Sequence, residues 1–184
     1  MPAHVRWLFV ALTAVASSLF VAHGTSIQNS PRTVILEVVR NSWDTERNET
    51  LVYLRVYSDG FAEAHPMRKV DFRDVRFATK QLSADELGGL KHLLTEPATM
   101  QLQSTYSRYW GNKDFGHRYT VTISAKSQKQ LELVNFDPFL AQKDGKAYPE
   151  QLERLGCSIW KLRTEVSGES LEKNWLDGCV RLGY

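Results

Sequence analysis

The chain has 184 residues, of which 42% are hydrophobic and 24% charged, and its formal net charge at pH 7 is +2. This near balance argues against nucleic acid or an anionic membrane as the principal partner. The length suits one domain after a short N-terminal segment, and no internal repeat indicates a solenoid or an array.

Residues 1–24 have the order of a secretory signal peptide. Arg6 precedes the apolar residues 7–22, and Ala22 and Gly24 supply the small residues of a cleavage site after Gly24. The apolar segment is shorter than the roughly 20 residues that span a bilayer, and no basic cluster follows it, which favours cleavage over retention as a membrane anchor. We therefore predict a secreted or periplasmic protein whose residues 25–184 form one globular domain, with no membrane contact after cleavage.

Strand patterns dominate the first part of this domain. β-branched residues predict a strand over residues 33–40, and the polar residues 41–50 read as a loop. Alternation over residues 51–58 predicts a second strand, and Asp59-Gly60 predicts a hairpin turn. A charged edge strand is expected around residues 70–79.

A helix follows these strands. Ser83 and Glu86 have the spacing of a capping box, a stripe of leucines gives the helix one apolar face, and Pro97 ends it. Gly88 and Gly89 lie in its middle, which suggests either close backbone packing or a frayed helix.

Two further strands and a long helix complete the pattern. Residues 117–126 alternate, with Tyr119, Val121 and Ile123 inward, and residues 130–136 pair with them. A helix over residues 148–166 starts near Pro149, and its leucine stripe turns Trp160 away from the sheet. This order predicts an α+β domain in which a mostly antiparallel sheet is covered on one face by helices.

The two cysteines predict how the C-terminal part folds. Cys157 and Cys179 each lie 11 residues from Gly168, so a C-terminal helical hairpin that turns there, with Ser170 capping its second helix, brings them opposite each other. Two buried free thiols or a redox pair are the alternatives, but a redox pair usually has the spacing Cys-x-x-Cys, which is missing. Export makes a structural disulfide between Cys157 and Cys179 the favoured prediction.

Motifs of the common enzyme classes are missing from the sequence. It contains no Gly-x-Ser-x-Gly, His-Glu-x-x-His, Walker loop or Gly-x-Gly-x-x-Gly, and its three histidines after residue 24 are far apart. We therefore predict no catalytic residue, no cofactor and no metal site. The alternative is a hydrolase-like enzyme with an unrecognised polar site, in which His117 works with Asp114 or Asp137.

The segment 105–116 is the best candidate for a binding site. It combines four aromatic residues with an arginine and two glycines, a composition typical of binding loops. Tyr106, Arg108, Tyr109 and Trp110 are the predicted ligand-binding residues, and the outward polar face of residues 118–124 adjoins them. The alternative is a surface loop whose Trp110 and Phe115 pack back over the sheet.

A weak resemblance supports the same interpretation. The residues that carry it are Gly60, Leu82-Ser83, Glu86-Leu87, Tyr106 and the strand from Tyr119 to Ile123. With these residues the chain resembles small exported bacterial domains of uncharacterised function, which implies the cell envelope as the site of action and no particular activity. The sequence thus predicts a non-enzymatic extracytoplasmic binding or structural module whose partner is a protein, peptide or glycan of the envelope.

Overall fold

A computed structural model describes residues 32–43, 48–66, 77–107, 116–145, 147–169 and 178–181 of the chain. Its strands are β1 (Val34–Trp43), β2 (Asn48–Tyr57), β3 (Phe61–Ala64), β4 (Ala78–Gln81), β5 (Thr105–Ser107), β6 (Gly116–Ile123) and β7 (Lys129–Val134). Its helices are α1 (Ala84–Thr95), α2 (Pro97–Met100), α3 (Pro138–Lys143) and α4 (Glu150–Ser167). The predicted signal peptide lies outside the described residues.

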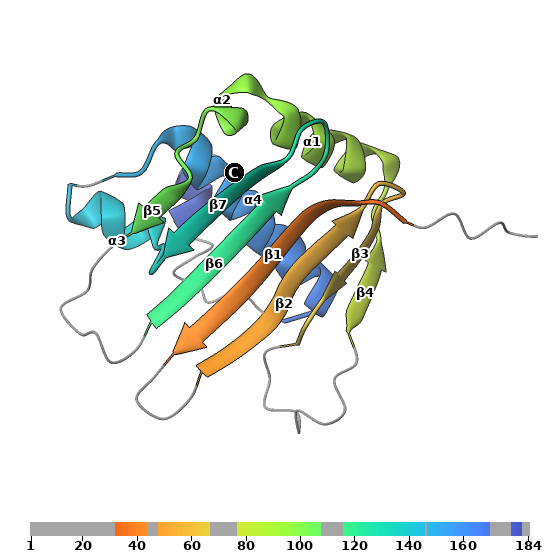
Figure 1. Ribbon diagram of the computed structural model, residues 1–184, viewed down its shortest axis with the longest axis horizontal. Helices are drawn as coiled ribbons and strands as arrows, with labels where there is room; N and C mark the ends of the chain where they lie inside the picture. Colours follow the sequence, from red (N-terminus) through yellow and green to blue (C-terminus); the bar gives the residue numbers. More distant parts are fainter. Residues whose placement is uncertain are drawn as a thin grey trace, which may run out of the picture. The chain divides into compact units, whose positions relative to one another are not determined.

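The strands form one seven-stranded sheet in the order β4-β3-β2-β1-β6-β7-β5. Neighbouring strands are antiparallel except for β5 and β7, which are parallel. Helix α4 lies across one face of the sheet, with α1 beside it (Figure 1). The predicted α+β fold with a mostly antiparallel sheet covered on one face is therefore confirmed.

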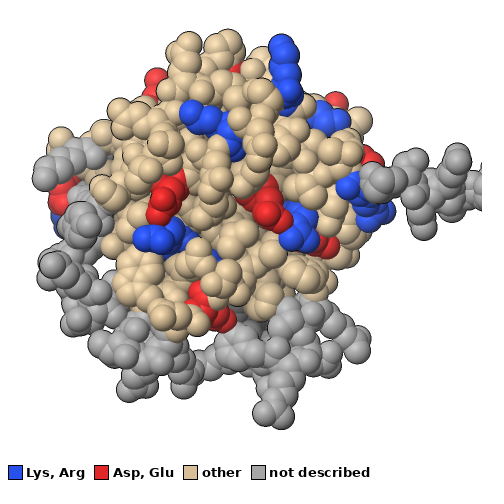
Figure 2. All heavy atoms as spheres, viewed as in Figure 1, with Lys and Arg blue, Asp and Glu red and all other residues tan. Residues whose placement is uncertain are grey.

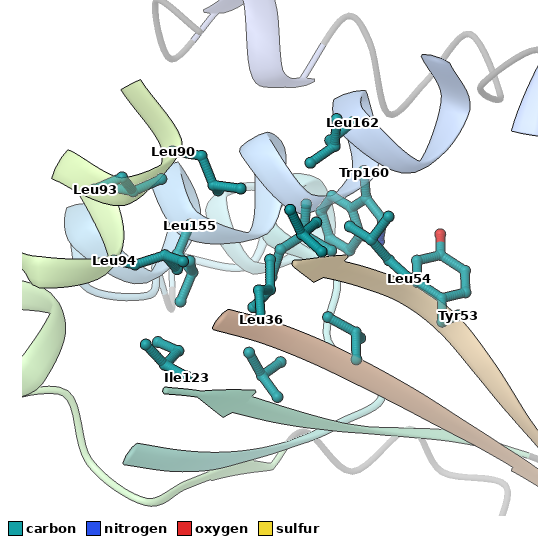
Figure 3. Close-up of a cluster of buried hydrophobic side chains, with 14 of the residues drawn as sticks. Leu36, Tyr53, Leu54, Leu90, Leu93, Leu94, Ile123, Leu155, Trp160 and Leu162 are labelled. Atoms are coloured by element: carbon teal, nitrogen blue, oxygen red, sulfur yellow. The ribbon is translucent and has the colours of Figure 1, made fainter. Parts of the chain in front are cut away.

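The core lies between this covered face, called the inner face below, and the helices. Leu36, Leu54 and Ile123 of the sheet belong to one buried cluster with Leu155 of α4 and with leucines of α1 (Figure 3). Leu36, Leu54, Ile123 and Leu155 have no exposed surface. Burial of such side chains is the main stabilising contribution, worth about 1.5–3 kcal/mol for each one. The opposite, open face of the sheet carries no helix among the described residues (Figure 1).

Strands β1 and β2 are longer than the sequence pattern indicates. The prediction of a loop over residues 41–50 was wrong for Asn41–Trp43 and Asn48–Thr50, which pair with each other. Backbone hydrogen bonds form whatever the side chains are, and here the Thr50 hydroxyl also donates to Asn41 Oδ1 over 2.6 Å. The polar side chains of these residues show that this part of the hairpin lies outside the hydrophobic core, and they do not show where the strands end.

Helix α1 begins as predicted. The Glu86 backbone N–H donates to Ser83 Oγ, and the Ser83 backbone N–H donates to the Glu86 carboxylate, which completes the capping box. Its two central glycines, however, have no packing role. A Cβ atom built on Gly88 or Gly89 would meet nothing within 4 Å, and both residues are exposed.

We therefore expect Gly88→Ala and Gly89→Ala each to raise the free energy of unfolding by about 1 kcal/mol, because glycine costs the helix conformational entropy. Urea unfolding measures the change. Gly60→Ala is the matched control, since Gly60 has φ +85° and a Cβ there would lie 2.9 Å from the Gln81 amide nitrogen; that variant should lose stability. Destabilisation by the two helix variants would contradict this account.

Helix α4 is buried on most of its circumference, which corrects one prediction. Trp160 faces the sheet and stacks on Phe136 with a ring centroid distance of 5.3 Å. The leucine stripe misleads because Leu155 lies beside Leu94 of α1 (Figure 3), so α1 takes part of the apolar face. Gly156 explains how Phe136 approaches so closely, since a Cβ there would lie 2.6 Å from the phenyl ring.

The predicted disulfide is present. Cys157 and Cys179 are bonded, their Cα atoms are 5.7 Å apart, and Cys157 is 2% exposed. Gly168 ends α4 in the left-handed conformation, with φ +67°. Residues 178–181 are helical, and residues 170–177 of the predicted hairpin lie outside the described ranges. The disulfide indicates an oxidising, extracytoplasmic environment.

The helices that the structure describes include none that is long and apolar enough to cross a membrane.

Candidate functional site

One end of the sheet collects the connections between strands. Because β1 is antiparallel to both β2 and β6, the end of β1 at Trp43 lies beside the starts of β2 at Asn48 and β6 at Gly116 (Figure 1). The end of β3 at Ala64 and the end of β5 at Ser107 lie at this end too, by their strand pairings. We call this end of the sheet the loop end. In the sequence, residues 44–47, 67–76 and 108–115 connect the strands that end and begin there.

Of the four predicted ligand-binding residues, the structure describes Tyr106. Tyr106 lies in β5 and packs inward, with its ring 6.4 Å from that of Tyr148 and its hydroxyl accepting the Gln103 backbone N–H over 2.9 Å. Arg108, Tyr109 and Trp110 lie outside the described residues. Within the predicted loop, Tyr106 is thus an anchor of an edge strand, and the segment that follows it joins β5 to β6 at the loop end.

Trp43 lies on the open face of the sheet at this end. Its indole lies against the backbone of Gly116, since a Cβ on Gly116 would come within 2.3 Å of the ring. Asn135, which has φ +50°, forms hydrogen bonds with His117, the residue of β6 that follows Gly116. Its side chain accepts the His117 backbone N–H over 2.9 Å, and its own backbone N–H donates to the His117 carbonyl over 2.8 Å. The start of β6 is therefore fixed by contacts on both strands beside it.

Three polar side chains meet on the inner face of the loop end. Ser42 is paired with His117 across β1 and β6, and Arg40 is paired with Tyr119. Arg40 Nη2 lies 3.0 Å from His117 Nδ1 and 3.2 Å from Nε2, and Ser42 Oγ lies 3.2 Å from Nδ1. We call Arg40, Ser42 and His117 the polar corner.

Aromatic and charged residues continue the polar corner toward α4. A β-bulge at Tyr53 turns this residue as well as Leu54 inward. The rings of Tyr53 and Tyr119 meet edge to face at 5.3 Å, and the Arg163 guanidinium lies 4.6 Å from the Tyr53 centroid. Burial raises the pKa values of both tyrosines, while the charges of Arg163 and Arg40 act in the opposite direction. Both hydroxyls stay protonated at pH 7.

Arg163 is the most deeply buried cation of this region. Its Nη2 donates to Glu169 over 2.6 Å and to the His65 carbonyl oxygen over 3.2 Å, and its side chain is 6% exposed. Removing both charges of such a pair from water costs free energy, and the attraction between the two partners offsets this cost. Through the His65 carbonyl and the Tyr53 ring, Arg163 ties this part of α4 to the sheet.

His117 has a basicity unlike that of an ordinary surface histidine. Partial burial of the ring and the charge of Arg40 lower the pKa of His117 to about 4, against a hydrogen bond with the Gly116 backbone that raises it, so the imidazole is neutral at pH 7. Its ring contacts Arg40, Ser42 and the Gly116 backbone, and its backbone N–H donates to Asn135. Asp137 is not among these partners, and Asp114 lies outside the described residues.

This pKa predicts a pH dependence of folding. The unfolded chain binds a proton at His117 near pH 6.5, whereas the folded chain does so only near pH 4. The stability that the neutral ring contributes is therefore present above pH 6.5 and is lost as the pH falls toward 4. Solvent screening at the exposed ring edge reduces the effect.

An NMR titration of the histidine rings measures it. We expect His117 to titrate near pH 4, and His117→Gln to flatten the stability profile between the two pKa values. A His117 ring that titrates near the ordinary histidine pKa of 6.5 would contradict the geometry of the corner.

The open face carries charges in compensated groups. Arg55 bridges Glu37 and Glu63 at 2.6 and 2.7 Å, and Arg118 pairs with Glu132 at 2.7 Å. Positive and negative side chains accordingly alternate over this face (Figure 2). No cluster of three or more potential metal ligands occurs within the described ranges. A small apolar cavity between sheet and α4, lined by Val38, Leu133 and Trp160 among others, belongs to the core.

Comparison with known proteins gives no assignment. No protein-family model matches the chain, and no curated protein matches it in sequence.

Proposed function

We propose that the chain is an exported, non-enzymatic binding module that contacts a protein, peptide or glycan of the cell envelope through its loop end. The observation that carries the proposal is the convergence of strand ends, where Trp43 and the polar corner lie at the start of β6, which follows residues 108–115 in the sequence. Rigid scaffolds present binding residues on connections at one end in this way.

The sequences of these connections support the proposal. Residues 44–47, 67–76 and 108–115 contain four aromatic residues, Phe72, Tyr109, Trp110 and Phe115, and charges of both signs. Aromatic side chains supply large contact areas at low entropic cost, and Trp and Tyr are typical of interface centres. Compensated charges on the open face argue against a polyanionic partner.

The chemistry of His117 favours binding over hydrolysis. A general base works best when its pKa is near the operating pH. Burial and, after it, the charge of Arg40 lower the pKa of His117 to about 4, which makes His117 a weak base at neutral pH. The hydrolase-like alternative would need a carboxylate at His117 to raise this pKa.

Export also belongs to this proposal. The signal-peptide pattern of residues 1–24 and the buried disulfide both support action outside the cytoplasm.

Retention on envelope fractions of the source organism tests the proposal. Purified wild-type protein and Trp110→Ala are compared, with Phe61→Ala as the control, because Phe61 begins β3 at the opposite end of the sheet. We expect Trp110→Ala to lose most of the retention and Phe61→Ala to keep it. Equal retention of wild type and Trp110→Ala would end the proposal.

A further inference from the structure

Asn48 is the one residue of the sequence that has the pattern of an acceptor for N-linked glycans. Asn48-Glu49-Thr50 is the only Asn-x-Ser/Thr triplet among the 184 residues. Such triplets are glycosylated at the surface of exported proteins. The disulfide between Cys157 and Cys179 indicates an extracytoplasmic environment. The sequence pattern and the compartment therefore agree at this residue.

The triplet lies at the surface of the loop end. Asn48 is the first residue of β2 and directly follows the connection 44–47. Asn48 and Thr50 are both exposed. Asn48 is paired with Trp43 of the open face, and Thr50, two residues further along the strand, shares that face. A glycan on Asn48 would therefore extend into solvent and displace no side chain of the core, which lies on the inner face.

Trp43 offers a surface on which the first sugar of such a glycan can pack. Residues directly opposite each other in an antiparallel pair have Cβ atoms about 4.5–5.5 Å apart, and Trp43 and Asn48 are such a pair. The indole lies against Gly116 of β6, on the side of β1 away from Asn48. Trp43 is half-buried, so part of its surface is exposed beside Asn48. The C–H groups on one face of a sugar ring complement the negative face of an aromatic ring.

We propose that the exporting cell attaches an N-linked glycan to Asn48 and that the first sugar packs on Trp43. The co-substrate is a sugar carried on a lipid diphosphate, and a glycosyltransferase of the cell is the catalyst. The side-chain amide nitrogen of Asn48 forms a bond to the anomeric carbon of the sugar, while the bond from that carbon to the diphosphate oxygen breaks. The lipid diphosphate leaves, and the amide nitrogen gives up one proton to it. This modification requires the export that belongs to the proposed function, but it does not require the loop end to bind a ligand.

Mass spectrometry of the protein isolated from its source organism tests the modification. Trypsin cuts after Arg47 and Arg55, and so releases the triplet in the peptide of residues 48–55. We expect this peptide to be heavier by the mass of whole sugar residues, with fragment ions that place the added mass on Asn48. A wholly unmodified peptide 48–55 would overturn the proposal.

Variants at Thr50, produced in the same organism, decide whether the triplet is responsible. Thr50→Ala removes the hydroxyl that the pattern requires and should abolish the added mass. Thr50→Ser is the matched control, since it keeps a hydroxyl at the same exposed position and should retain the added mass. Asn48→Gln gives the same test as Thr50→Ala if that variant does not fold. Added mass on Asn48 that persists in Thr50→Ala would overturn the proposal.

Thermal unfolding tests the contact with Trp43. The glycosylated wild type should unfold at a temperature a few degrees above that of Asn48→Gln, and Trp43→Ala should remove most of this difference. Phe61→Ala is the control and should leave the difference unchanged, because Phe61 is an aromatic residue at the opposite end of the sheet. No difference between wild type and Asn48→Gln, or a difference that is equal with and without Trp43, would overturn the contact.

The outcomes separate this modification from the proposed binding function. A glycan on Asn48 in a protein that envelope fractions do not retain would overturn only the binding module. Envelope retention that needs Trp110, by a protein whose Asn48 is unmodified, would overturn only the glycosylation.

Discussion

Replacing Cys157 and Cys179 together by alanine is expected to lower the free energy of unfolding by roughly 3 kcal/mol. The disulfide joins residues 22 positions apart and so restricts the unfolded chain, and it ties the described C-terminal residues 178–181 to α4. Cys157 is buried, so the variant also loses some packing. Urea unfolding under non-reducing conditions measures the loss.

Val180→Ala is the control that separates the loss of the disulfide from the effect of any substitution beside it. Val180 is 68% exposed and follows Cys179 directly, so Val180→Ala should change stability by less than about 0.5 kcal/mol. Dithiothreitol added to the wild type should reproduce the loss seen in the double variant. A double variant as stable as the wild type would mean that the disulfide contributes nothing to the free energy of unfolding.

Glu169→Ala is expected to cost about 3 kcal/mol or more, because it leaves the Arg163 charge buried without its carboxylate. The Arg163 side chain is 6% exposed and its partner 14% exposed, and the two atoms in contact are 2.6 Å apart. Thermal and urea unfolding measure the change. The loss should be accompanied by altered signals from Tyr53, on whose ring Arg163 lies.

Glu165→Ala is the matched control for this prediction. Glu165 lies four residues before Glu169 and pairs with Lys80 over 2.9 Å. The side chains of Glu165 and Lys80 are each about a third exposed. Exposed pairs contribute only about 0–1 kcal/mol. Equal losses from Glu165→Ala and Glu169→Ala would show that burial of the Arg163 pair has no special role.

Local signals in the sequence predicted much of the fold. The capping box at Ser83 and Glu86, and the turn at Gly60, involve residues close in sequence, so their geometry can be inferred from residue type. The disulfide could be predicted because its two cysteines are equally spaced in sequence about Gly168, the residue at which α4 ends.

The errors arose where packing between distant elements decides the outcome. Residues 41–43 and 48–50 continue the β1–β2 hairpin because backbone pairing does not depend on apolar side chains. Trp160 faces the sheet because Gly156 makes room for Phe136 and α1 covers the flank of α4. Neither relation leaves a periodic pattern in the sequence.

The candidate site could be predicted only in part. The aromatic composition of residues 105–116 drew attention to the connection between β5 and β6. Arg40 and His117 are 77 residues apart, and only the pairing of β1 with β6 brings them together. Gly116 was a possible signal, since a glycine next to an aromatic segment allows close approach of a ring such as that of Trp43.

Amide hydrogen exchange, measured by mass spectrometry on the protein alone and on envelope material, tests most directly whether the loop end binds the ligand. The account predicts slower exchange in the bound state over residues 43–48 and 107–117, and unchanged exchange over the turn at residues 58–60 at the opposite end of the sheet. Protection confined to that turn, or equal exchange in both states throughout residues 43–48 and 107–117, would contradict it.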